Sequence, residues 1–117
     1  MTVQESFDHL VETVRGYNPS ANFDLIRSAF EFADKAHEGQ LRKDNSPFVT
    51  HPLAVAQIVA EELHLDSESI AAALLHDTIE DTAATHEQIA ELFSPTIANL
   101  VEGASKLTRV QIGRAHV

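Results

Sequence analysis

The sequence contains no cysteine, which excludes disulfide bonds, thiolate nucleophiles and cysteine-ligated zinc sites. It has no apolar run near the roughly 20 residues that span a bilayer, and its first residues, MTVQESFDHL, lack the basic start and apolar stretch of a signal peptide. Glycine and proline, at four residues each, are too few for a low-complexity or collagen-like chain. The length of 117 residues suits one domain. We therefore expect a single globular domain in the cytoplasm, with no membrane partner.

Basic residues are also scarce, with 8 Lys and Arg against 18 Asp and Glu and a net charge of −10 when His is neutral. Such a surface repels the phosphates of nucleic acids at long range, so we expect no nucleic-acid partner. A small phosphorylated ligand needs only a local basic pocket and stays compatible with this charge. The seven histidines stand out, because histidine serves mainly as a metal ligand, an acid or a base.

Apolar residues recur at helical spacing along most of the chain, and no segment has a convincing strand pattern. Turn and capping signals separate the expected helices, among them Gly16, Gly39 and the capping box Thr85-x-x-Gln88. The helices are predicted over residues 3–15, 24–38, 50–63, 67–81, 85–93 and 95–102. The run 70–75 is apolar on nearly every side, so the fourth helix should be central. The sequence therefore predicts an all-α bundle of orthogonally packed helices.

The residues best suited to metal binding or catalysis lie in one short stretch, LLHDTIEDT, at the end of the apolar run. Ionisable groups at the end of a buried helix are costly unless they have a purpose. On a continuous helix His76 and Glu80 would share one face, and Asp77 and Asp81 the adjacent face. A metal between these faces could bind His76 and Asp77. Glu80 and Asp81, here the acidic pair, would then face the water bound to that metal. Such mixed ligands suit manganese, iron or zinc. The alternative is a helix end whose polar residues only mark the surface.

Four segments of the chain together resemble a known family. The segments are AHEGQLRK (36–43), THPLAVAQIVAEE (50–62), LLHDTIEDT (74–82) and VEGASKLTRV (101–110). Their order and spacing are similar to those of the hydrolase domain of RelA/SpoT-type alarmone enzymes, a branch of the HD-domain phosphohydrolases. The resemblance extends from about residue 23 to residue 110, so it covers most of the chain, and it implies an HD-type helical bundle.

The resemblance assigns a metal site and an acidic pair. His51 matches the first metal-ligating histidine, and His76 with Asp77 matches the His-Asp pair of the family. Glu80 and Asp81 match the acidic pair that positions and activates the attacking water. The implied cofactor is Mn²⁺. Metals of this kind lower the pKa of bound water, and nearby carboxylates can take its proton, so elementary chemistry agrees with the implied roles.

The resemblance also implies a nucleotide pocket. Arg42 and Lys43 match basic loop residues that contact the guanine nucleotide, and Ser105 and Lys106 match a segment that lines the pocket. With Arg109, these basic side chains are half of the eight in the chain, a plausible phosphate-facing set in an acidic protein. The alternative for each is a solvated loop charge.

The implied reaction is removal of the 3′-pyrophosphate from (p)ppGpp, the alarmone of the stringent response, which gives GDP or GTP. Two other interpretations stay open. One is an HD-domain phosphohydrolase that acts on another nucleotide. The other is a catalytically silent regulatory HD domain of a (p)ppGpp synthetase. The intact residues His76, Asp77, Glu80 and Asp81 argue against a silent domain, because degenerate members often lose them.

The chain departs from the family pattern at one serious point. The family has a fourth protein ligand, an Asp on a later helix, and no Asp follows Asp81 here. We therefore interpret residues 1–111 as the N-terminal part of a truncated HD hydrolase domain, which should bind metal weakly and turn over poorly. Residues 112–117, IGRAHV, resemble the translation of a sequencing-adapter read and are expected to be a non-native tail.

Two further expectations concern packing. His37 lies on the core face of its helix, and we expect it to be buried and hydrogen-bonded, although metal ligation is an alternative. A truncated bundle should leave an apolar face uncovered, with Leu74, Ile79 or the residues near Leu100 unusually exposed. Self-association through that face is the expected consequence.

Overall fold

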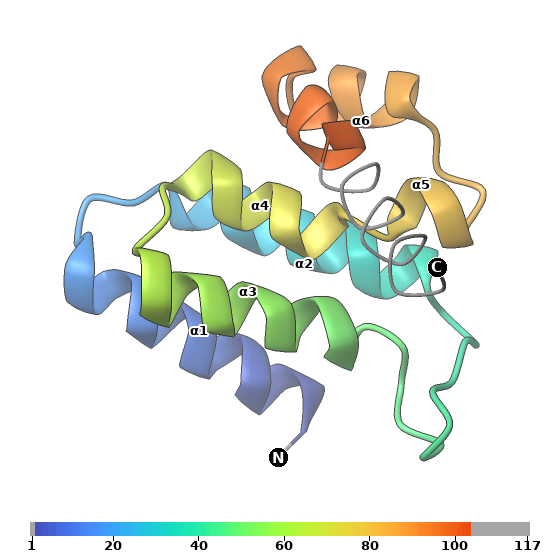
Figure 1. Cartoon of the computed structure of the whole chain (residues 1–117), viewed down its shortest axis with the longest axis horizontal. Coiled ribbons are helices and arrows are strands. Elements are labelled where there is room, and N and C mark those ends of the chain that lie inside the picture. The colour runs from blue at the N-terminus through green and yellow to red at the C-terminus, as the bar shows by residue number, and fades with distance from the viewer. Residues whose placement is uncertain (1, 104–117) are drawn as a thin grey trace, which may run out of the picture.

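The computed structural model describes residues 2–103 and consists of helices joined by short connections (Figure 1). Its described part contains no β-strand, only an isolated bridge between Leu41 and Pro47. The all-α prediction is therefore confirmed. The helices are α1 (Val3–Tyr17), α2 (Phe23–Ala36), α3 (Thr50–Leu63), α4 (Ser67–Leu75), α5 (Thr78–Asp81) and α6 (His86–Leu92), followed by a helical stretch over residues 95–103.

Side-chain caps define where several helices begin. The hydroxyl of Thr2 accepts a hydrogen bond from Glu5 N, and the carboxylate of Glu5 accepts one from Thr2 N, which is a complete capping box for α1. Thr85 and Gln88 form the predicted capping box of α6. After α2 the chain turns at Gly39, whose φ of 84° favours a residue without a side chain. These local signals explain why most predicted helix positions agree with the structure.

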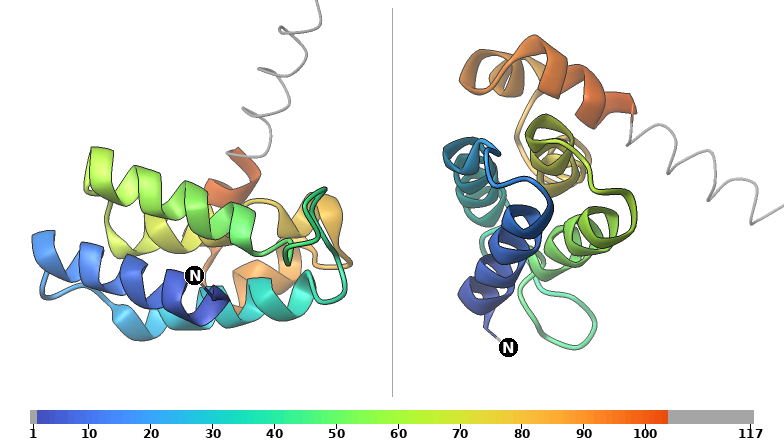
Figure 2. Two further views of the ribbon diagram at one scale, coloured as in Figure 1. Left: turned by 90° about the horizontal axis from the view of Figure 1, so that it is seen from below. Right: turned by 90° about the vertical axis from the view of Figure 1, so that its left-hand side faces the viewer.

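The helix α4 occupies the centre of the bundle, as its apolar sequence predicted. It packs against both α2 and α3, and α3 packs in turn against α1. Figure 2 shows α1 to α4 nearly end-on in its right panel, with residues 95–103 lying across them. The core draws side chains from all of these elements. Its largest fully buried members are Phe7, Leu10, Val14, Ile26, Val49, Ile70, Leu74, Leu75, Thr78, Ile89, Ile97 and Val101.

The structure corrects one predicted element. The helix expected over residues 67–81 is two helices, because α4 ends at Leu75 and α5 begins at Thr78. The Thr78 side chain is fully buried, and its hydroxyl donates to the carbonyl of Leu75 at 2.8 Å. A carbonyl at a helix end needs such a partner. The His76–Asp77 pair therefore sits at a break between two helices, not on a continuous helical face.

The expectation of an uncovered apolar face holds only in part. Leu74 is fully buried, contrary to the prediction, because its side chain is on the face of α4 that belongs to the hydrophobic core. Ile79 is half-buried against the core. Leu100 is 41% exposed, in agreement with the expectation, and Leu63 at the end of α3 is 64% exposed. No helix in residues 2–103 has the length and apolar character needed to cross a membrane.

Candidate metal centre

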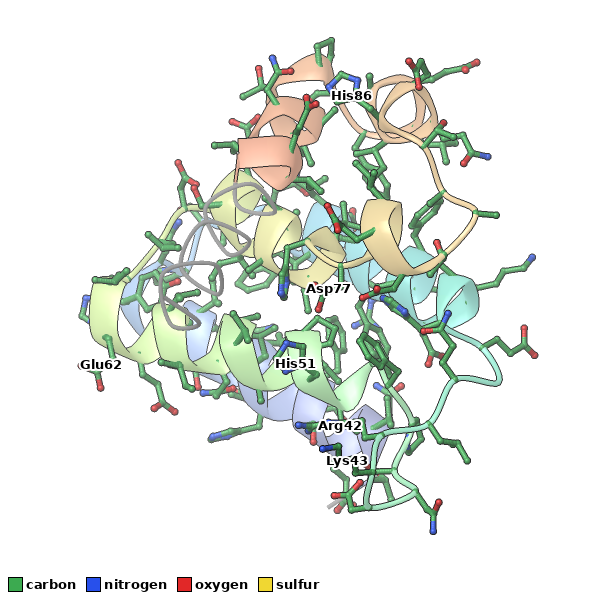
Figure 3. The ribbon with its side chains drawn as sticks, turned by 45° about the vertical axis from the view of Figure 1, so that its right-hand side comes forward. Arg42, Lys43, His51, Glu62, Asp77 and His86 are labelled. Carbon is green, nitrogen blue, oxygen red and sulfur yellow. The ribbon has the colours of Figure 1, made fainter. Side chains whose placement is uncertain are left out.

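Three side chains from two parts of the chain converge at the break after α4. His51 comes from the first turn of α3, while His76 and Asp77 form the α4–α5 junction. The Asp77 Oδ2 atom lies 3.1 Å from His76 Nε2 and 3.4 Å from His51 Nε2. One ligand atom from each residue lies within 4.8 Å of the other two. Figure 3 shows His51 of α3 and Asp77 of the α4–α5 junction facing each other. These three residues, here the triad, could hold a metal ion.

The hydrogen bonds of His76 direct its ring toward Asp77. The ring is buried, with 8% of the residue exposed, and its Nδ1 lies 2.6 Å from the carbonyl oxygen of Ala73. A carbonyl oxygen can only accept, so Nδ1 carries a proton and donates it. Nε2 is then the nitrogen available to a metal. Backbone carbonyls commonly orient metal-ligating histidines in this manner.

Burial and mutual charge shift the pKa values of the triad in different directions. Burial lowers the pKa of His51 below its ordinary value of 6.5, and the charge of Asp77 only partly opposes this. Burial also acts to lower the pKa of His76, but its hydrogen bonds to Asp77 and Ala73 outweigh that effect and raise it. For Asp77, burial is outweighed by His76, His51 and His37, and its pKa falls below 3.8. Asp77 therefore carries a negative charge at neutral pH beside two imidazoles.

The acidic pair lies on the short helix α5, one turn beyond the triad. The amide of Asp81 donates to the carbonyl of Asp77 at 2.9 Å, so the predicted four-residue relation between these two carboxylates persists despite the break. Both Glu80 and Asp81 are exposed. Partial desolvation of its carboxyl group and the nearby charge of Asp77 nevertheless raise the pKa of Asp81 above its ordinary value of 3.8. A carboxylate with a raised pKa is a better proton acceptor than an ordinary one.

The basic residues of the α2–α3 loop approach the same centre. Arg42 and Lys43 are exposed, and Figure 3 places both on the side of the molecule that carries His51. A hydrogen bond of 2.9 Å from Arg42 N to the carbonyl of Ser46 closes the loop, with Asn45 in the left-handed region. The charge of Arg42 contributes to the lowered pKa of His51, so the loop lies within electrostatic reach of the triad. The other expected pocket residues, Ser105 and Lys106, lie outside the described part of the chain, as does Arg109.

His37 is buried, as expected, but it does not join the triad. Only 2% of the residue is exposed, and its Nδ1 lies 3.1 Å from Oε1 of Gln40. The amide nitrogen of Gln40 donates to the carbonyl of Asp81 at 2.8 Å. The sequence pattern alone assigned no role to Gln40. Its position inside AHEGQLRK, one of the segments that carried the resemblance, was the available signal.

An apolar groove adjoins the triad on the side of α3 and α4. Its volume is about 420 Å³. His51 and His76 form its polar end, and the rest is largely aliphatic. The lining residues are His51, Val55, Val59, Leu65, Ser69, Ala72, Ala73, His76 and Leu100.

A helical bundle with a paired His and Asp at a helix end, joined by a second histidine, is the arrangement that the resemblance implied. The sequence profile of the HD domain matches residues 29–116. The chain belongs to the HD-domain family. The triad of this HD domain lies within the matched region, as do the acidic pair and the basic loop.

Several curated proteins of the RelA/SpoT group are similar to this HD domain over most of its length. A probable GTP pyrophosphokinase of Mycobacterium leprae is 45% identical over 97% of the chain. A GTP pyrophosphokinase of Myxococcus xanthus is 48% identical over 89% of it. The bifunctional (p)ppGpp synthase/hydrolase SpoT of Escherichia coli is 46% identical over 95%. The chain spans 14% to 15% of the length of these relatives. It is a RelA/SpoT-type HD domain.

Proposed function

We propose that this HD domain is a metal-dependent (p)ppGpp 3′-pyrophosphohydrolase that uses Mn²⁺. The observation that carries the proposal is the convergence of His51, His76 and Asp77 within 4.8 Å of one another. The acidic pair follows one turn later. The relatives support the substrate, since one is named a (p)ppGpp synthase/hydrolase and another a guanosine-3′,5′-bis(diphosphate) 3′-pyrophosphohydrolase.

The triad suits a divalent metal by its chemistry. It offers two imidazole nitrogens and one carboxylate oxygen, a mixed set that fits manganese, iron or zinc. The carbonyl of Ala73 fixes the His76 ring so that Nε2 faces Asp77. When bound, the ion would lower the pKa of a coordinated water and neutralise charge on a phosphoryl oxygen. With three ligands from the described residues, solvent or substrate oxygens would complete its coordination.

The acidic pair supplies the base. In the proposed reaction a water oxygen attacks the phosphorus bound to the ribose O3′, and the P–O3′ bond breaks. Asp81, whose pKa is raised by burial and by Asp77, accepts the proton of the water. Glu80, its neighbour on α5, orients that water. The ribose O3′ takes up a proton from solvent as it leaves, and Asp81 returns its own proton to solvent. The products are pyrophosphate and GDP or GTP with a free 3′-hydroxyl.

The basic loop supplies the phosphate contacts. Arg42 and Lys43 are exposed beside His51, so their charges can reach a diphosphate held at the triad. Arginine can bind phosphate oxygens through two parallel hydrogen bonds, and lysine adds a compact charge. We also propose that Ser105 and Lys106 line the same pocket.

The second candidate is a catalytically silent regulatory HD domain of a (p)ppGpp synthetase. The names of two relatives, which are GTP pyrophosphokinases, favour it. The two candidates differ in chemistry and not in fold. A silent domain binds no catalytic metal or binds it without turnover, whereas the proposed hydrolase releases pyrophosphate.

The deciding experiment measures pyrophosphate release from ppGpp labelled with ³²P in its 3′-diphosphate. The chain is incubated with Mn²⁺ and, in parallel, with a chelator. Because no Asp follows Asp81, we expect slow turnover by the chain alone. Faster turnover is expected from a chimera in which it replaces the aligned segment of the E. coli relative. Labelled pyrophosphate should form only with metal.

Two variants make the assay specific. His76→Ala removes a proposed ligand and should abolish both Mn²⁺ binding and turnover. Glu80→Gln keeps the triad and should lower the rate about 10- to 100-fold while sparing Mn²⁺ affinity. Metal binding without any turnover by the wild-type chain or the chimera would favour the silent regulatory domain.

A further inference from the structure

Gln40, which lies outside the triad, connects three parts of the proposed catalytic centre, which are α5, the segment before His51 and the basic loop. Gln40 lies at the start of the α2–α3 loop, and its side-chain amide nitrogen donates to the carbonyl of Asp81 at 2.8 Å. Its backbone carbonyl accepts from Phe48 N at 3.0 Å, and the carbonyl of Phe48 accepts from His51 N at 3.0 Å. Gln40 thus joins the helix of the acidic pair to the segment that leads into His51.

The same residue begins the basic loop. Arg42 and Lys43 follow it directly, and the hydrogen bond between Gln40 O and Phe48 N closes the loop at its base. Displacement of Gln40 would therefore move the acidic pair, the basic loop and the start of α3 relative to one another.

His37 fixes the orientation of the Gln40 amide. The amide nitrogen must point to Asp81, because only a donor can pair with a carbonyl oxygen. The amide oxygen Oε1 then faces His37 Nδ1 at 3.1 Å, so Nδ1 must carry a proton. The backbone adds a third link, since Gln40 N donates to the carbonyl of His37 at 2.9 Å.

The other nitrogen of His37 shows that this arrangement has a cost. Nε2 is buried and has no hydrogen-bond partner in the described part of the protein. Such an atom calls for an explanation, because an apolar ring would fill the same place without leaving a polar atom unpaired. The ring centroid lies 4.6 Å from that of Phe48, with the two planes tilted by 33°, and a phenyl ring could make the same contact. What an apolar ring cannot supply is the Nδ1 donor that holds Gln40.

We propose that His37 and Gln40 are positioning residues for the hydrolytic reaction. Two hydrogen bonds in series set the distance of α5 and its acidic pair from the triad. The first runs from His37 Nδ1–H to Gln40 Oε1, and the second from Gln40 Nε2–H to the carbonyl oxygen of Asp81. This inference rests on the proposed function for its catalytic readout. The hydrogen-bond chain itself can be tested without any turnover.

The first test separates positioning from stability by substitutions that differ in one hydrogen bond. Gln40→Glu keeps the acceptor for His37 but loses the donor to Asp81, and Gln40→Leu loses both. Each should lower kcat about 10- to 100-fold at unchanged Mn²⁺ affinity. His37→Asn retains a donor at the position of Nδ1 and should keep most of the activity, whereas His37→Phe should lose it like Gln40→Leu.

Gln57→Leu is the matched control. Gln57 also bridges elements through its amide, donating to Thr13 Oγ1 and Glu61 Oε1 at 2.7 Å each, and neither of these partners belongs to the triad, the acidic pair or the basic loop. It should match Gln40→Leu in its effect on the unfolding temperature and leave kcat unchanged. Equal kcat in Gln40→Leu and wild type, or equal losses in Gln40→Leu and Gln57→Leu, would overturn the proposal.

The second test uses the chain without substrate. Long-range ¹H–¹⁵N NMR should show the proton of neutral His37 on Nδ1, and paramagnetic relaxation by Mn²⁺ should report the distance of the Asp81 amide from the ion. In Gln40→Leu this relaxation should change, and in Gln57→Leu it should not. A His37 proton on Nε2, or unchanged Asp81 relaxation in Gln40→Leu, refutes the positioning role. A wild-type chain that passes this test but releases no pyrophosphate refutes the proposed function instead.

Discussion

The Nε2 atom of His76 lies 3.1 Å from Oδ2 of Asp77, the next residue in the chain. Consecutive side chains on a continuous helix diverge by about 100°, so this approach depends on the break between α4 and α5. The turn lets both side chains point to one place, where His51 arrives from α3. The break therefore builds the candidate metal centre.

Removal of either member of this pair should abolish Mn²⁺ binding. His76→Ala and Asp77→Ala each remove one of three converging ligands, and the remaining two cannot hold the ion tightly. His86→Ala is the control, because that histidine pairs with Glu102 and Asn99 away from the triad. Titration followed by Mn²⁺ electron paramagnetic resonance should show full binding in the control. Wild-type affinity in either triad variant would contradict the assignment.

Mn²⁺ affinity should increase with pH. The pKa of His76 is raised above 6.5 by Asp77 and the Ala73 carbonyl, so a proton competes for the nitrogen that would bind metal. Affinity should fall by up to about tenfold for each pH unit below that pKa. Without metal the sign is opposite, because a raised histidine pKa stabilises the fold below pH 6.5 and this contribution is lost as the pH rises through the raised pKa. Calorimetric titration at pH 6, 7 and 8 checks the affinity, and a flat profile would contradict it.

Asp81→Asn should make the chain slightly more stable at neutral pH while reducing turnover. Burial and Asp77 raise the pKa of Asp81, so its charged form costs stability above the ordinary value of 3.8. The side chain is exposed, which limits the gain to less than about 1 kcal/mol. The gain in stability should vanish near pH 3, where the Asp81 carboxyl is protonated in both the folded and the unfolded state.

Asp66→Asn is the control for the sign of this effect. Asp66 caps α4, and hydrogen bonds from Ser69 lower its pKa, so removal of its charge should destabilise the chain at pH 7. Thermal unfolding of both variants at pH 7 and pH 3 gives the comparison. A lower unfolding temperature for Asp81→Asn at pH 7 would contradict the prediction.

Weak self-association should occur through the apolar groove beside the triad. Leu100 is 41% exposed and lines the groove with aliphatic residues of α3 and α4. Leu100→Lys places a charge there and should shift the chain toward monomer. Leu92→Lys, a change at a more exposed site that is not part of the groove lining, should not. Sedimentation velocity at increasing concentration measures the difference. A wild-type chain that stays monomeric throughout would refute the prediction.

The sequence by itself determined the helical class and singled out the candidate site residues. Periodic apolar positions and caps such as Thr85 are local features, and local backbone energetics act on them whatever the rest of the chain does. The apolar run of α4 likewise required a central position. Four matching segments then indicated which histidines and acids belong together, and the structure brings His51, His76 and Asp77 to one place.

Only the tertiary structure decided the end of α4 and the contacts around it. Periodicity continues smoothly through residues 67–81, and the break depends on a buried Thr78 hydroxyl whose surroundings come from other helices. The full burial of Leu74 and the link from Gln40 to Asp81 are of the same kind, since the latter joins residues 41 positions apart. Contacts between distant residues depend on how the helices pack, and the pattern along one helix does not specify which residues of its neighbours it meets.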